Sequence, residues 1–189
     1  MSAIALRAPV RGAVGWVQRF AVDTNSVVER QLCMLSVYVA AQFVFVLPSV
    51  EATEPWAVLL AGALMVAATA GAFALRGPEM PVKAAMLIPL VDLLAVGLLR
   101  AGTGGWTSVF SALLILPVLS LGVEPGRLPL LFGGLVTAGV AVLPELIDPT
   151  VVDDGQWIRG TFTLLVLGLT ALSVNELTRR LRDRVKAVQ

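Results

Sequence analysis

The chain has 189 residues, of which 57% are hydrophobic and 14% are charged, with 14 basic and 13 acidic side chains. An average soluble domain carries about 25% charged residues, so this composition excludes an ordinary soluble globular protein and indicates a protein embedded in a lipid bilayer. The sequence contains no histidine and a single cysteine, Cys33. These counts exclude a histidine-ligated haem, a phospho-accepting histidine and an internal disulfide framework in this chain.

The N-terminal segment, residues 1–30, is polar and basic ahead of the first long apolar run. Residues 8–22 place apolar side chains mainly on one side of a helix, and Arg11, Gln18 and Arg19 toward the other. This pattern is typical of an amphipathic helix in the inner headgroup region; the alternative is an unstructured tail. Ser26 and Glu29 fit a capping box, which predicts that a new helix begins there and enters the bilayer.

Six apolar runs follow, each near the length of about 20 residues that a helical crossing needs. They cover residues 31–47, 56–75, 84–99, 108–123, 128–147 and 157–175. The predicted fold class is therefore an all-α polytopic membrane protein with six transmembrane helices, whose transmembrane sensor domain covers residues 31–175. An even number of crossings puts both termini on the same side of the membrane.

The basic residues indicate which side that is. Only Arg100 and Arg159 fall in the first, third and fifth loops, whereas the other basic residues fall in the two tails and the remaining two loops. The positive-inside rule then predicts that both termini are cytoplasmic. Trp56, Trp106 and Trp157 all lie at the outer ends of the spans, as the residues of an aromatic belt do.

Asp92 is the only acidic residue deep inside an apolar run, where a carboxylate is costly unless it has a partner or a function. It is either a polar centre for a ligand or proton, or a hydrogen-bonding group that fixes helix packing. Arg100 lies eight residues later, about 12 Å along a straight helix, too far for a direct pair. Suitable partners for Asp92 on other spans are Tyr38, Gln42, Ser111 and Thr137.

The final segment, residues 176–189, combines apolar heptad positions with many arginines. The apolar positions are Leu177, Leu181, Val185 and Val188. This pattern predicts that the sixth helix continues into the cytoplasm as the start of a coiled-coil signalling helix, and that the protein is a homodimer. We expect a further domain to follow such a helix. The alternative is a basic flank that only anchors the last span.

The sequence offers no catalytic set. It has no nucleophile with a suitable base, no metal-ligand spacing and no phosphate-binding loop. We therefore expect no enzyme activity and no metal site within this chain. The basic tail suits anionic lipid, whereas a nucleic-acid partner would need a folded basic face that the sequence lacks.

Residues 104–110 read GGWTSVF and form the predicted turn between the third and fourth spans. This stretch resembles the quinone-responsive outer loop of RegB-type redox sensor histidine kinases, in which Gly-Gly and two variable residues precede Asn-Pro-Phe. Pilus-regulating sensor kinases have a similar glycine-rich hairpin. The chain keeps both glycines and the phenylalanine, and Ser108 and Val109 stand where the family has Asn-Pro.

The resemblance implies the six-helix membrane region of a bacterial signalling protein in the inner (cytoplasmic) membrane. It also implies a quinone or another hydrophobic small molecule as ligand. The candidate ligand-binding residues are Asp92 in the third span, Arg100 directly after that span, and the matching residues of the turn, Gly104, Gly105, Trp106 and Phe110.

The sequence thus predicts the sensory input and dimerisation domain of a signal-transduction protein. A ligand or redox change near the third and fourth spans would shift the last helix. A histidine kinase is favoured as the output, and a diguanylate cyclase, which similar six-span inputs also precede, comes next. Two alternatives stay open: a complete small substrate-binding subunit of a membrane transporter, and a scaffold without a ligand.

Overall fold

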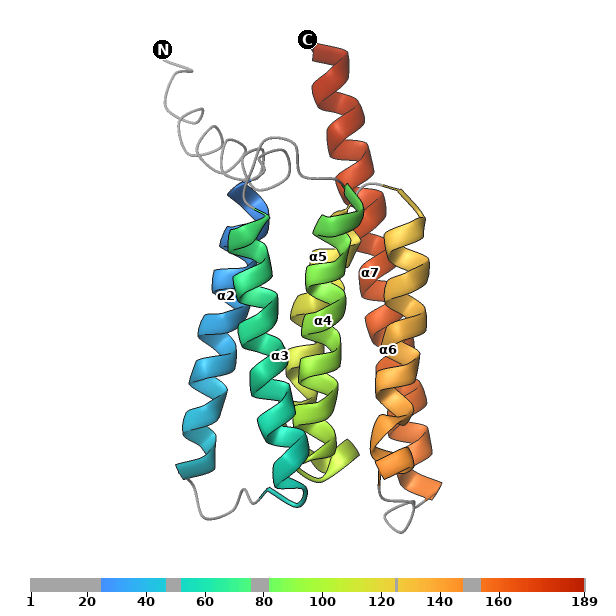
Figure 1. The fold of residues 1–189 in the computed structure, drawn as a ribbon. Coiled ribbons are helices and arrows are strands. Elements are labelled where there is room, and N and C mark those ends of the chain that lie inside the picture. The colour runs from blue at the N-terminus through green and yellow to red at the C-terminus, as the bar shows by residue number, and fades with distance from the viewer. Residues whose placement is uncertain (1–24, 47–51, 76–81, 125, 148–153, 189) are drawn as a thin grey trace, which may run out of the picture.

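The computed structural model describes residues 25–46, 52–75, 82–124, 126–147 and 154–188. These residues form helices joined by short turns and contain no strand, which confirms the all-α fold class (Figure 1). The α-helices are α2 (Asn25–Gln42), α3 (Pro55–Ala74), α4 (Val82–Ala101), α5 (Ile115–Val123), α6 (Leu128–Ile147) and α7 (Asp154–Val188). Three short 3₁₀ helices are η1 (Phe43–Val46), η2 (Gly105–Thr107) and η3 (Val109–Leu114).

The helices lie side by side in one bundle, with neighbours in sequence running in opposite directions (Figure 1). We call the end at which α2, α4 and α6 begin the upper end, as it is drawn in Figure 1, and the opposite end the lower end. Helix α4 is central and packs against α3, α5 and α6, while α7 packs against α5 and α6. The last part of α7 extends beyond the upper end of the bundle (Figure 1).

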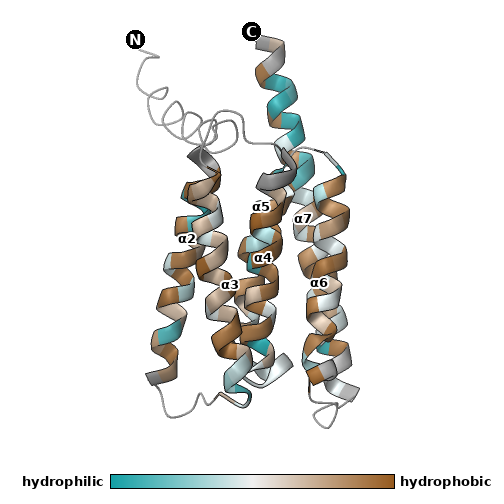
Figure 2. Ribbon diagram, in the orientation of Figure 1, coloured by the Kyte–Doolittle hydropathy of each residue, from teal (hydrophilic) through white to brown (hydrophobic). Residues whose placement is uncertain are grey.

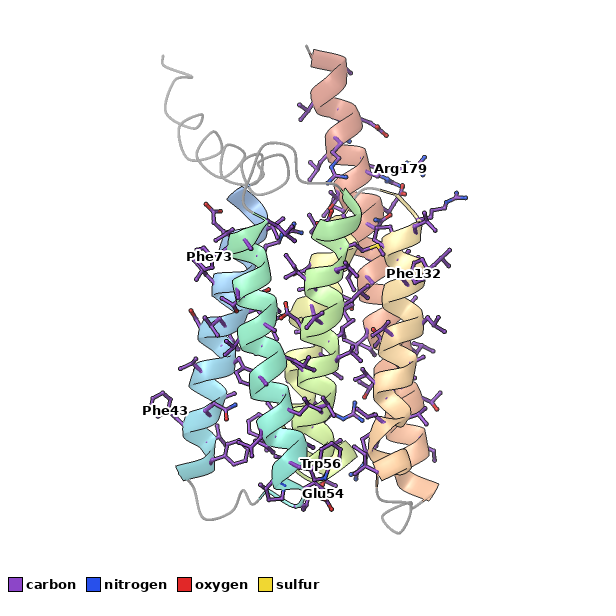
Figure 3. All side chains as sticks on the ribbon, in the orientation of Figure 1. Phe43, Glu54, Trp56, Phe73, Phe132 and Arg179 are labelled. Carbon is purple, nitrogen blue, oxygen red and sulfur yellow. The ribbon has the colours of Figure 1, made fainter. Side chains whose placement is uncertain are left out.

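The outside of the bundle is hydrophobic over most of its height. Large apolar side chains are exposed on every side of it, including Phe43 (70%), Leu59 (75%), Leu135 (71%) and Ile158 (72%). Hydrophilic residues concentrate on the part of α7 beyond the bundle (Figure 2), and the labelled Phe43, Phe73 and Phe132 project outward (Figure 3). Because soluble proteins rarely expose such extended apolar surface, this distribution is compatible with a bundle surrounded by lipid.

Three helical stretches are long and apolar enough to cross a membrane. They are Val27–Phe45, Pro55–Ala74 and Ile158–Val185. Two further apolar helices, Val109–Val123 and Leu128–Pro144, are shorter. The predicted amphipathic helix over residues 8–22 lies outside the described residues, so the structure does not test it.

The predicted spans 56–75 and 128–147 correspond closely to α3 and α6. The predicted span 108–123 differs, because its first part is the 3₁₀ helix η3 and only its second part is α-helical. Ser108 caps η3, since its Oγ accepts a hydrogen bond from the backbone N–H of Phe110 (3.3 Å). A 3₁₀ helix rises about 2.0 Å per residue and an α-helix about 1.5 Å. The 6 residues of η3 thus lengthen this helical segment by about 3 Å.

Small residues bring the central helices close together. The buried face of α3 carries alanines at Ala57, Ala61, Ala68 and Ala72. On α4, Gly97 faces α6 so closely that a Cβ atom there would lie 2.5 Å from Cγ1 of Val140. Helices in lipid associate through such close packing, because a bilayer supplies little hydrophobic driving force between them.

Candidate functional site

Asp92 lies in the interior of α4 and is 3% exposed. Its Oδ1 accepts a hydrogen bond from Nε2 of Gln31 on α2 (3.0 Å). Gln31 is itself 2% exposed, so the pair satisfies two polar groups that would be costly to bury alone. The partner of Asp92 is therefore Gln31, and not one of the four residues that the sequence suggested.

Gln31 connects three helices. Its Nε2 also donates to Oγ1 of Thr69 on α3 (3.3 Å), and the Thr69 hydroxyl donates to the carbonyl oxygen of Met65 one turn earlier (2.8 Å). The amide thus uses both of its hydrogens. A movement of α2 relative to α4 would break or re-form this contact between Gln31 and Asp92.

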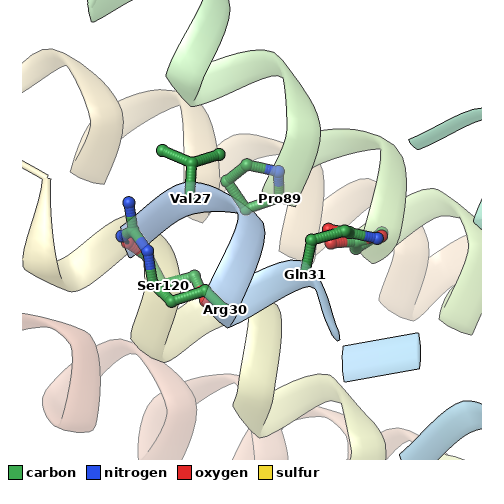
Figure 4. Close-up of a pocket in the computed structure, with 6 residues that line it drawn as sticks. Val27, Arg30, Gln31, Pro89 and Ser120 are labelled. Carbon is green, nitrogen blue, oxygen red and sulfur yellow. Dashed lines mark hydrogen bonds between the residues drawn. The ribbon is translucent and has the colours of Figure 1, made fainter. Parts of the chain in front are cut away.

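A small polar cavity lies beside this pair (Figure 4). Its volume is about 10 Å³, and its lining residues are Val27, Arg30, Gln31, Pro89, Asp92 and Ser120. That volume is near the lower limit for one water molecule, whereas ligand pockets measure about 300–1,000 Å³. In this conformation the surroundings of Asp92 therefore suit a proton or a single water, and its predicted role toward a larger ligand stays a prediction.

Arg30, next to Gln31 on α2, reaches the end of α5. Its Nη2 lies 2.7 Å from Oε1 of Glu124, and the two side chains are only 12% and 9% exposed. Its Nη1 donates to the carbonyl oxygen of Ser120 (3.2 Å). A buried ion pair needs such additional hydrogen bonds to offset the cost of desolvating both charges.

The last turn of α5 is held from two sides. The final four carbonyls of a helix have no partner within it. Here the carbonyl of Ser120 accepts from Arg30, and that of Leu121 accepts from the backbone N–H of Glu124. Two side chains of α7 reach the other two: Asn175 Nδ2 donates to Gly122 (3.0 Å) and Arg182 Nη2 donates to Val123 (2.8 Å).

These contacts form one polar cluster, which extends from the middle of α4 to the upper end of the bundle. It consists of Asp92, Gln31, Arg30, Glu124, Asn175 and Arg182. Two of its members, Arg30 and Gln31, are consecutive on α2, so the backbone of α2 joins the hydrogen bond of Asp92 to the contacts of Glu124. The cationic groups of Arg30 and Arg182 lie at the carbonyl end of α5, where the helix dipole favours positive charge.

The predicted ligand-binding residues of the loop lie at the lower end, away from this cluster. Arg100 is in the last turn of α4 instead of in the following loop, and its side chain is completely buried. Its Nε donates to the carbonyl of Gly105 (3.2 Å) and its Nη2 to that of Ala141 on α6 (3.3 Å). Arg100 thus holds the glycine loop, residues 102–108, against α6.

The backbone of the glycine loop requires its two central glycines. Gly104 has φ of 95° and Gly105 has φ of 61°, and both values favour glycine because other residues meet a steric penalty there. The loop is closed by the hydroxyls of Thr103 and Ser108, whose Oγ atoms lie 2.7 Å apart. The side chain of Trp106 lies outside the described side chains, so its predicted role is not tested.

Phe110 is 2% exposed and stacks on Phe45 of η1, with ring centroids 5.4 Å apart. Two polar residues lie close to this aromatic pair in sequence: Gln42, three residues before Phe45, and Ser111, directly after Phe110. Gln42 Nε2 and Ser111 Oγ are buried and have no hydrogen-bond partner in the part of the chain that the structure describes. Buried polar groups without a partner are rare and costly, so each of these two atoms is a donor that an acceptor would satisfy.

Two of the apolar side chains of the predicted signalling helix are exposed. Leu177 is 59% exposed and Leu181 is 41% exposed, while Val185 is half-buried. The side chain of Val188 is not among those described. Helix α7 is continuous from Asp154 to Val188, so these residues lie on the same rod as Asn175 and Arg182.

The structure therefore separates the predicted site residues into two groups. It brings Arg100 and Gly105 together but places Asp92 in a different cluster, with Arg30, Gln31 and Glu124, which sequence reasoning did not select. Little in the sequence indicates that Arg30 and Glu124 belong to a site, because both lie at the ends of apolar runs, where charged residues are common. Among the described residues, no three histidine, cysteine, aspartate or glutamate side chains are grouped so that they could hold a metal ion.

Comparison with known proteins gives no further guide to function. The chain matches no protein-family model, no curated protein and no solved structure. The resemblance to sensor kinases consequently rests on the glycine loop and on the predicted topology.

Proposed function

We propose that this chain is the sensory input and dimerisation domain of a bacterial signalling protein, with six membrane crossings and the upper end of the bundle at the cytoplasmic face. A bound hydrophobic molecule or a redox change shifts the helices around α4, and α7 carries the shift out of the membrane. The choice of a histidine kinase or a diguanylate cyclase as the output follows only from the sequence resemblance.

The observation that carries this proposal is the polar cluster. It links a buried carboxylate in the bundle to Asn175 and Arg182, at the point where α7 leaves the bundle. A signal can reach α7 through this route only if the ligand binds two arrangements of the helices with different affinity. Between Asn175 and Arg182 along α7, Leu177 and Leu181 offer an exposed apolar strip of the kind that pairs in a coiled coil.

Disulfide cross-linking tests the dimer. In a Cys33→Ser background, Leu177→Cys and Leu181→Cys are each expected to give cross-linked dimers in membranes under mild oxidation, because paired a and d positions bring Cα atoms within disulfide range, about 4.4–6.8 Å. Arg179→Cys is the matched control, since Arg179 is exposed and lies two residues from each leucine, on the opposite side of α7. Absence of cross-links at both leucines, or equal cross-linking at residue 179, would contradict the dimer and favour the transport subunit.

The ligand of this domain is a hydrophobic molecule with a hydrogen-bond acceptor, such as a quinone. Gln42 Nε2 and Ser111 Oγ support this choice, because each is buried without a partner among the described residues and is a donor that a carbonyl group would satisfy. Ser111 follows the glycine loop that resembles the quinone-responsive motif by three residues. Quinones would reach these residues from the bilayer, as expected for a bundle with an apolar exterior.

The test is a change in cross-linking at Leu181→Cys when an oxidised short-chain quinone is added to membranes. The quinone is expected to change the cross-linking rate, and Gln42→Leu with Ser111→Ala is expected to abolish that change. Ser36→Ala is the control, because the Ser36 hydroxyl is exposed and bonded to its own helix. A quinone response that persists in the double variant would remove these two residues from the site.

A further inference from the structure

A second and much larger hollow lies at the upper end of the bundle, between the start of α6 and the part of α7 that leaves the bundle. Its volume is about 600 Å³, within the range of small-molecule sites. Its lining residues are Glu124, Gly126, Arg127, Leu130, Leu131, Leu172, Asn175, Glu176, Thr178, Arg179, Arg182 and Asp183. Arg179 is seen at this level of α7 in Figure 3.

The charges around this groove do not cancel. Its lining contains Arg127, Arg179 and Arg182 and the acidic residues Glu124, Glu176 and Asp183. Glu124 and Glu176 are paired with Arg30 and Arg180, which do not line the groove. When these two arginines are included, five positive charges face three negative ones. The groove therefore has an excess of positive charge, and it suits an anionic group.

The apolar residues of the groove lie on one side of its arginines. On α6, Leu131 is one turn further into the bundle than Arg127, since its backbone N–H donates to the Arg127 carbonyl. On α7, Leu172 lies seven residues before Arg179, about 10 Å along the axis. Leu131 and Leu172 are 68% and 53% exposed. The groove is thus cationic toward the end of the bundle and apolar toward its middle.

We propose that this groove binds an anionic phospholipid of the cytoplasmic leaflet. Arg127 and Arg179 contact the phosphate group, and the acyl chains lie along Leu131 and Leu172. Basic groups near a membrane surface attract anionic lipids, and the leucines favour a lipid over a free phosphate ion, which has no chains to bury. The inference rests on the proposed membrane orientation, but it does not depend on signalling or on the quinone.

This lipid and a dimer partner would occupy different faces of α7. Leu172, Glu176, Arg179 and Asp183 follow helical spacing along the groove, whereas Leu177 is rotated by about 100° from Glu176. The coiled-coil strip therefore stays free when the lipid is bound. A bound lipid would instead connect α7 to α6 beside the contacts of Asn175 and Arg182 with α5.

The test uses the full chain, purified in mild detergent and mixed with phosphatidylglycerol and phosphatidylcholine in equal amounts. Native mass spectrometry is expected to show a preference of about tenfold or more for phosphatidylglycerol. The double variant Arg127→Gln and Arg179→Gln is expected to lose the preference. The double variant Arg159→Gln and Arg184→Gln, which removes the same charge from exposed arginines outside the groove, is expected to keep it.

Three outcomes would overturn the proposal: equal binding of the two lipids by the unmodified chain, equal loss of preference in both double variants, and full displacement of the lipid by millimolar inorganic phosphate. The second would indicate diffuse attraction by the basic tail, and the third a site for free phosphate. Cross-linking at Leu181→Cys, measured on the same variants, reports the dimer separately, so lipid binding and the proposed function can fail independently.

Discussion

The side-chain nitrogen of Gln31 lies 3.0 Å from Oδ1 of Asp92, and both residues are almost fully buried between α2, α3 and α4. The contact joins residues 61 positions apart in sequence. It explains how a carboxylate is accommodated in an apolar run, because an amide donor replaces the water that the carboxylate loses. It also joins α2 to the middle of α4.

Gln31→Leu is expected to destabilise the protein by about 1–3 kcal/mol, because it leaves the Asp92 carboxylate without this donor. Thermal unfolding of the purified protein in detergent measures the effect, with Ser36→Ala on the exposed side of α2 as the control. A melting temperature equal to that of the control would show that Asp92 has another adequate partner.

Asp92→Asn is expected to leave expression and thermal stability nearly unchanged, since the Asn side-chain oxygen still accepts from Gln31. It removes the charge and the titratable proton, so the response of cross-linking at residue 181 to quinone is expected to change. The cross-linking rate with and without oxidised quinone is the measurement. An unaltered response would limit Asp92 to a packing role.

Arg30→Leu is expected to cost about 3–5 kcal/mol, because it leaves the Glu124 carboxylate buried and unpaired. The double variant with Glu124→Leu is expected to recover part of this loss, since no charge is then stranded. Unfolding temperatures of the two single variants and the double variant form the test. Glu176→Gln, at an exposed ion pair, is the control and is expected to have no measurable effect. Strict additivity of the two single changes would argue against direct coupling.

Gly97→Ala is expected to destabilise the bundle by about 1–3 kcal/mol, because the added Cβ would lie 2.5 Å from Cγ1 of Val140 and force α4 and α6 apart. Gly134→Ala on α6 is the matched control, since a Cβ there meets nothing within 4 Å. Thermal unfolding distinguishes the two. If Gly134→Ala were the more damaging change, the packing of α6 described here would be wrong.

Gly105→Ala is expected to be destabilising by about 1–3 kcal/mol, because its φ of 61° is strained for alanine and the new Cβ would lie 2.9 Å from Cβ of Pro144. The carbonyl of Gly105 also accepts from Arg100, so a shift of the loop would disturb a buried guanidinium. Gly139→Ala, with no neighbour within 4 Å of its Cβ, serves as the comparison in the same unfolding assay. Equal stability of the two variants would contradict this geometry.

Much of the fold could be predicted from the sequence, because the length of apolar runs and the position of breakers depend on local chemistry. The runs now seen as α3 and α6 were predicted almost to the residue, and α7 is continuous as the heptad pattern predicted. The 3₁₀ helix η3 was not predicted. The run VFSALL contains no residue that excludes an α-helix, so the tighter winding depends on how the neighbouring helices pack.

The site was less predictable, for a related reason. Asp92 was recognised because a charge in an apolar run is conspicuous, yet its partner depends on the depth and rotation of α2. Helices that are hydrophobic on all sides give little indication of which face meets which neighbour. The burial of Arg100 could not be predicted for the same reason, since its guanidinium is satisfied by the carbonyl of Ala141, which lies 41 residues away in sequence.

The winding of η3 sets how α5, which follows it directly, is rotated about its own axis. A 3₁₀ helix turns by about 120° per residue and an α-helix by about 100°. If the 6 residues of η3 changed pitch to an α-helix, α5 would rotate by about 120° and travel about 3 Å along its axis. Such a screw motion would carry Glu124 away from Arg30 and the last carbonyls of α5 away from Asn175 and Arg182, releasing α7 in a single step.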